Sequence, residues 1–69
     1  MKNSNYNLLN ILTQKLQAIW RYDQYIQDAE KEGCQSCVEL WKKLKKIDQS
    51  QIQELRAEIE NHVRQDIFE

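Results

Sequence analysis

The stretch Ala29-Glu30-Lys31-Glu32-Gly33 contains the only glycine of a 69-residue chain that has no proline. Gly33 lies almost at the midpoint, and the residues on both sides are mostly strong helix formers, chiefly Leu, Gln, Glu, Lys, Ala and Ile. A glycine suits the left-handed position that follows the end of a helix. The sequence therefore predicts one all-α domain over residues 1–69, an antiparallel hairpin of helices at about 7–31 and 35–66.

Apolar residues recur at helical spacing in both segments. The stripes consist of Leu8, Leu12, Leu16, Ile19 and Ile26 in the first segment, and of Cys37, Leu40, Trp41, Leu44, Ile47, Leu55 and Ile59 in the second, with His62 on the same face. Asn5 or Asn7 is the expected cap of the first helix, and Ser36 with Glu39 forms a capping-box pattern for the second. Because two helices leave half of each stripe in water, we expect two copies to pair into a four-helix bundle, as a homodimer or a larger assembly. The alternative partner is a helix pair of another protein.

The charge balance, the lengths of the apolar runs and the absence of catalytic motifs exclude several classes of function. Ten basic and eleven acidic residues give a net charge of -1, so the chain has no electrostatic footprint for nucleic acid. No apolar run has the length of a membrane span and no signal-like segment is present, so we expect a cytoplasmic protein, in which a disulfide would be unusual. No nucleophile–base–acid set or glycine-rich phosphate loop is found. A structural or interaction role is therefore favoured over an enzyme.

Polar residues interrupt the apolar stripes in the middle of both helices. Lys15 and Asp23 fall on the inner face of the first helix, and Asp48 and Gln51 on that of the second. Buried charges are costly unless they are paired. Either Lys15 reaches Asp48 across the hairpin with Gln51 hydrogen-bonded to one of them, or Lys15 extends to solvent and Asp48 stays hydrated.

From residue 22 to residue 51 the chain resembles the ferritin-like and rubrerythrin-like superfamily. The matching positions are Tyr22, Ala29, Lys31-Glu32-Gly33, Leu40-Trp41 and Asp48-x-x-Gln51. In that family a glutamate of the first helix and a Glu-x-x-His pair of the second hold two irons. When the pattern is aligned on Gly33, these ligand positions are occupied here by Lys15, Asp48 and Gln51.

The departures from the family pattern decide what the resemblance implies. An ammonium at Lys15 cannot bind a cation, and Gln51 offers only a neutral oxygen. The resemblance therefore implies a short, two-helix form of the bundle that has lost its di-iron centre, with a Lys15–Asp48 ion pair in place of the metal. No cofactor is expected on this interpretation.

Two further residue pairs keep a metal or redox function open. Cys34-x-x-Cys37 begins the second helix, where a thiol pair can serve in redox chemistry or as half a zinc site, although one loop cysteine plus one core cysteine is the simpler interpretation. Glu58 and His62 lie one turn apart and could bind zinc or iron, with Asp48 and residues of a second chain as further ligands. An ion pair between residues four apart is the simpler alternative for them. The alternative functions are thus an iron- or zinc-binding oxidoreductase-like protein with a shifted intersubunit site, or a CxxC thiol or zinc dimer.

Overall fold

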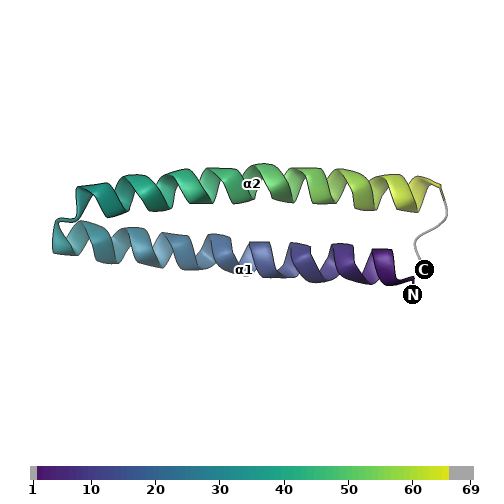
Figure 1. The fold of residues 1–69 in the computed structure, drawn as a ribbon, viewed down its shortest axis with the longest axis horizontal. Helices are drawn as coiled ribbons and strands as arrows, with labels where there is room; N and C mark the ends of the chain where they lie inside the picture. The colour runs from purple at the N-terminus through teal and green to yellow at the C-terminus, as the bar shows by residue number, and fades with distance from the viewer. Residues whose placement is uncertain (1, 66–69) are drawn as a thin grey trace.

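The computed structural model describes residues 2–65, which form two helices in a hairpin. The helices are α1 (Asn3–Glu32) and α2 (Gln35–Arg64), of 30 residues each, and they lie side by side and antiparallel along their whole length (Figure 1). Each helix is about 45 Å long at 1.5 Å per residue. The predicted all-α helical hairpin is confirmed, while the predicted end of the second helix at residue 66 lies outside the described residues.

The turn between the helices depends on Gly33. Its φ of 74° and ψ of 20° are in the left-handed region, which costs glycine no steric energy. The Gly33 N–H donates to the Glu30 carbonyl at 3.2 Å, and the Cys34 N–H donates to the Ala29 carbonyl at 2.9 Å. These bonds satisfy the last carbonyls of α1, as a helix C-cap requires. The predicted role of Gly33 is confirmed.

Both predicted N-terminal caps are wrong. α1 begins at Asn3, so Asn5 and Asn7 lie inside the helix, and the capping position is held by Lys2, whose side chain makes no capping bond. α2 begins at Gln35 with Cys34 as its cap, and the Cys34 sulfur accepts the Cys37 N–H at 3.3 Å. No helix breaker lies between the observed start of either helix and the side chain that was expected to cap it, so each helix begins before that side chain.

The helices meet along one seam with alternating spacings of three and four residues, the pattern of a coiled coil. All its positions are buried or half-buried, and we call them the seam: Asn5, Leu8, Leu12, Lys15, Ile19, Tyr22, Ile26 and Ala29 in α1, with Cys34, Val38, Trp41, Lys45, Asp48, Ile52, Leu55, Ile59 and His62 in α2. Its most buried apolar residues are Ala29, Val38 and Ile52.

The seam is narrower than the predicted apolar stripes. Leu16, Leu40 and Ile47 were expected on the buried face, yet they are 53%, 48% and 43% exposed. Two helices in contact cover only two positions in seven. Leu16 lies beside those positions, and Leu40 and Ile47 lie further round α2. Within residues 2–65 neither helix has an apolar stretch long enough to cross a membrane.

Candidate functional site

The middle of the seam holds a polar cluster built around Lys15. Its Nζ atom lies 2.6 Å from Gln51 Oε1 and 3.5 Å from Asp48 Oδ1. The side chains of Lys15 and Asp48 are only 25% and 16% exposed, so the ion pair is mostly shielded from water. Of the two arrangements considered from the sequence, the structure shows the pair across the hairpin and not the lysine extended to solvent.

Tyr22 is a fourth member of this central polar cluster. Burial raises the pKa of its hydroxyl, and the negative charge of Asp48 and a hydrogen bond to that carboxylate raise the pKa further. Tyr22 therefore remains neutral at physiological pH and donates to Asp48. Among the described residues, no buried side-chain nitrogen or oxygen lacks a hydrogen-bond partner.

The central polar cluster does not fit a di-iron centre. The Lys15 ammonium occupies the Gln51 oxygen that a metal ion would have to use, and it also neutralises the Asp48 carboxylate. No three His, Cys, Asp or Glu side chains gather into a ligand group anywhere in residues 2–65 of one chain. The cluster supplies a half-buried, internally neutral set of hydrogen bonds.

Asp23 was expected on the inner face with the central residues, and this expectation is wrong. Its side chain is 52% exposed and accepts a 2.6 Å ion pair from Lys45 Nζ. Asp23 lies one position beside the seam residue Tyr22, which places it at the solvent edge of the contact. Exposed ion pairs of this kind contribute little, about 0–1 kcal/mol.

Cys34 and Cys37 form a disulfide in the first turn of α2. The interpretation as two unpaired cysteines is therefore wrong. Both cysteines belong to the start of one helix, so the bridge does not tie α1 to α2. Closing so short a loop contributes only about 2 kcal/mol in the chain-entropy account. The hairpin is thus held mainly by its seam and its turn.

A pocket of about 220 Å³ lies beside this disulfide, at the loop end of the hairpin. Its walls include Cys37, Tyr25 and Trp41, with the carboxylates of Asp28 and Glu32 at its border. The Tyr25 and Trp41 rings lie with centroids 5.4 Å apart, a distance at which aromatic rings attract each other. The loop end therefore combines an aromatic wall with acidic side chains.

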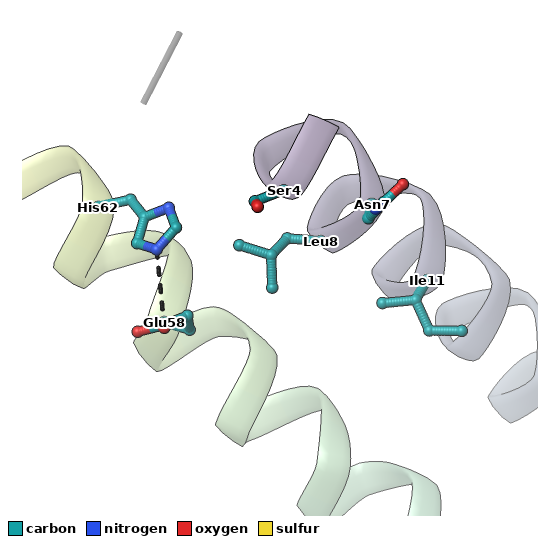
Figure 2. Close-up of a pocket in the computed structure, with 6 residues that line it drawn as sticks. All are labelled: Ser4, Asn7, Leu8, Ile11, Glu58 and His62. Atoms are coloured by element: carbon teal, nitrogen blue, oxygen red, sulfur yellow. Dashed lines mark ion pairs between the residues drawn. The ribbon is translucent and has the colours of Figure 1, made fainter. Parts of the chain in front are cut away.

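A larger pocket, of about 500 Å³, lies at the opposite end of the hairpin (Figure 2). Glu58 and His62 of α2 face the first turns of α1 across it, and His62 Nε2 lies 3.6 Å from Glu58 Oε2. The remaining lining residues are Ser4, Asn7, Leu8 and Ile11. Glu58 and His62 therefore lie on one side of α2, within the distance of the i,i+4 ion pair that was the simpler alternative. Asp48 is ten residues from Glu58, about 15 Å along the helix, so it lies in a separate site of the same chain.

Asn5 is the residue of this site that the sequence analysis missed. It is 1% exposed, and its Oδ1 atom lies 2.6 Å from His62 Nδ1. Because an asparagine near the start of a helix suggests a capping residue, the place of Asn5 in the contact between the helices was not predicted. Asn5 lies three residues before Leu8 and seven before Leu12, so the seam repeat places it opposite His62.

Comparisons with protein-family models, with curated proteins and with solved structures find no match to this chain. The ferritin-like resemblance therefore stays a prediction that rests on the residues between Tyr22 and Gln51.

Proposed function

We propose that this chain is a structural or protein-interaction module that acts as a pair of hairpins. Two copies form a ferritin-like four-helix bundle with the central polar clusters inside it, and the Lys15 ammonium takes the place of the metal ions. The observation that carries this proposal is a face beside the central polar cluster whose middle has no charged side chain in its two rows.

Residues spaced by seven along a helix lie on one side of that helix, and such rows define the face. The pocket of about 500 Å³ at the end away from the loop, which we call the terminal pocket, is lined by both Ile11 and Glu58. The pocket beside the disulfide, the loop-end pocket, is lined by both Tyr25 and Cys37. The row of residues that contains Ile11 and Tyr25 in α1 and the row that contains Cys37 and Glu58 in α2 therefore border the same side of the hairpin. We call this side the pocket face: Ser4, Ile11, Ala18, Tyr25 and Glu32 of α1, with Cys37, Leu44, Gln51 and Glu58 of α2, and with Leu40 and Ile47 along its α2 edge.

The other side of the hairpin has a different character. It consists of Leu9, Leu16, Asp23 and Glu30 of α1, with Lys42, Gln49, Arg56 and Val63 of α2, and we call it the opposite face. Charges are distributed along the opposite face, whereas those in the two rows of the pocket face, Glu32 and Glu58, lie near its ends. Covering the middle of the pocket face therefore requires no buried unpaired charge.

A second copy is the partner that fits this face best. The hairpin measures 50 × 16 × 12 Å, so its broad side is of the size of the roughly 800 Å² per partner that a stable interface buries. About a two-fold axis the uncharged middle pairs with itself, so no charge of the two rows lies at the centre of the interface. Lys15 and Asp48 lie near the middle of their helices, and each cluster is neutral overall, so a head-to-tail pair places the two clusters near each other without repulsion.

Two matched leucine variants test the proposal. Leu40 on the pocket face and Leu16 on the opposite face are 48% and 53% exposed, so glutamate at either position has a similar effect on one isolated hairpin. We expect Leu40→Glu to shift the protein from dimer to monomer in sedimentation equilibrium, while Leu16→Glu leaves the dimer intact. Circular dichroism checks that both remain helical. A monomeric wild type, or equal dissociation by both variants, would contradict the proposal.

The disulfide favours a second candidate function, thiol–disulfide exchange at Cys34 and Cys37. Structural disulfides resist reduction by glutathione, whereas exchange centres are reduced by it. Equilibration of the protein in glutathione buffers, followed by alkylation of free thiols and mass spectrometry, distinguishes the two. A bridge that stays oxidised in every such buffer would eliminate the redox function and leave a structural cross-link.

A further inference from the structure

The side chain of His62 is held between two oxygen atoms from different helices. Its Nδ1 lies 2.6 Å from Asn5 Oδ1, and its Nε2 lies 3.6 Å from Glu58 Oε2. The Asn5 oxygen can only accept a hydrogen bond, so Nδ1 carries a proton and donates it. In the neutral ring Nε2 then presents a lone pair toward a carboxylate. Two acceptors facing each other repel unless a proton or a metal ion lies between them.

From this arrangement we propose that His62 Nε2 and Glu58 Oε2 bind a zinc ion in the terminal pocket. Zinc bonds to imidazole nitrogen and to carboxylate oxygen are both about 2.0–2.2 Å long, so two ligand atoms on a tetrahedral ion lie about 3.4 Å apart. The observed 3.6 Å is close to that span, and it is longer than a hydrogen bond between these atoms.

Asn5 completes the site as a positioning residue. Histidines that bind metals donate their other ring N–H to an oxygen acceptor, which fixes the tautomer and the ring orientation. The Asn5 amide is buried at 1% exposure and supplies this acceptor from α1, while the two ligands come from adjacent turns of α2. The site thus exists only where the two helices are packed together.

The surroundings suit a divalent cation. Ser4 and Asn7 border the pocket with side-chain oxygens, and among residues 2–65 no lysine or arginine lines it. With two protein ligands, water molecules would complete the coordination shell. One nitrogen and one carboxylate favour zinc over magnesium or calcium, which prefer oxygen ligands alone. Both protein ligands come from one chain, so the site can form in a single hairpin, although Ser4, Ile11 and Glu58 also belong to the pocket face.

The experiment uses His62 as its own probe, because it is the only histidine of the sequence. Zinc is titrated into the oxidised protein without reductant, so that Cys34 and Cys37 supply no thiolates, and the imidazole signals are followed by NMR. We expect saturable shifts with zinc and none with magnesium, in the wild type and also in the Leu40→Glu variant. Binding in that variant separates this site from dimer formation. Imidazole signals that zinc does not move would overturn the proposal.

Four variants identify the ligands by competition with a zinc-binding dye. We expect His62→Gln and Glu58→Gln each to weaken binding by tenfold or more. Asn5→Leu should weaken it by about 10–100-fold, and Asn5→Asp should restore it. Glu60→Gln is the matched control, because Glu60 forms its own ion pair with Arg64 at 3.9 Å, also four residues apart. Equal losses for Glu58→Gln and Glu60→Gln, or full affinity in His62→Gln, would contradict the assignment, and circular dichroism confirms that each variant is folded.

Discussion

The loop end and the middle of the seam use the same heptad positions for opposite purposes. Near the turn, Ala29 and Val38 are both 4% exposed and pack as apolar residues. In the middle, Lys15 and Asp48 occupy equivalent positions and are paired through their charges. Burial at the loop end supplies stability directly, whereas the middle must recover the cost of removing two charges from water. The middle is therefore suited to specifying how helices align more than to holding them together.

The largest expected effect on stability comes from placing a charged side chain, of the kind found in the middle of the seam, at the apolar loop end. Val38→Asp places a carboxylate without a cationic partner among apolar neighbours, and we expect it to lower the free energy of unfolding by about 3 kcal/mol or more. Val63→Asp is the control, because that valine is 58% exposed, and it should change stability by about 0.5 kcal/mol or less. Thermal melting followed by circular dichroism measures both. Similar losses would mean that the loop end is not a packed core.

The next effect concerns the ion pair in the middle. Asp48→Ala leaves Lys15 half-buried with only the Gln51 oxygen, and we expect a loss of about 1–3 kcal/mol. The double variant Lys15→Met/Asp48→Leu removes both charges and should match or exceed the wild type, since apolar pairs often replace buried ion pairs without cost. Urea unfolding provides the comparison. A double variant less stable than Asp48→Ala would show that the pair is itself a major source of stability.

A smaller effect is expected at the turn that brings the loop end together. Gly33→Ala places a side chain at a φ of 74°, and its Cβ would meet no atom within 4 Å. The cost is therefore that of the left-handed backbone alone, about 1–2 kcal/mol. Gly33→Asn should cost less, because asparagine tolerates this conformation better. If the two variants unfold at the same temperature, the left-handed turn is not what limits this position.

The smallest expected effect is a dependence of stability on pH that arises from Tyr22 in the middle of the seam. The pKa of Tyr22 is raised in the folded chain above the ordinary value of 10.0, so the folded state holds this proton more tightly than the unfolded state. The resulting stability is fully present below about pH 10 and is lost as the pH rises through the folded pKa. Tyr22→Phe should remove this part of the alkaline loss in pH-dependent melting. An unchanged alkaline profile would contradict the hydrogen bond to Asp48.

Much of the fold could be predicted from the sequence, because a single helix-breaking residue separates the two helices. Gly33 is the only position that cannot be read as an ordinary helical residue, and its left-handed turn fixes the hairpin. The polar cluster was also predictable, because Lys15, Asp48 and Gln51 interrupt apolar stripes on facing sides. Tyr22 was not predicted to belong to the central polar cluster, because its aromatic ring is sufficient to explain a position among apolar residues.

The remaining errors have physical causes. A helical wheel shows a broad apolar stripe but not which two positions in seven a single neighbouring helix will cover, so Leu16, Leu40 and Ile47 were expected to be buried. Asn5 was misread because asparagine caps helices, and its burial depends on a partner 57 residues away. The pairing of Cys34 with Cys37 depends on how the first turn of α2 places the two side chains, and cysteine spacing alone does not determine that.

The central claim is that two hairpins join through the pocket face, and the molecular mass in solution tests it most directly. Sedimentation equilibrium of the wild type, Leu40→Glu and Leu16→Glu compares each with the 8.4 kDa mass of one chain. The account predicts twice that mass, or a larger even multiple, for the wild type and Leu16→Glu, and the single-chain mass for Leu40→Glu. A wild type with the mass of one chain at every concentration, or a dimer that only Leu16→Glu dissociates, would contradict it.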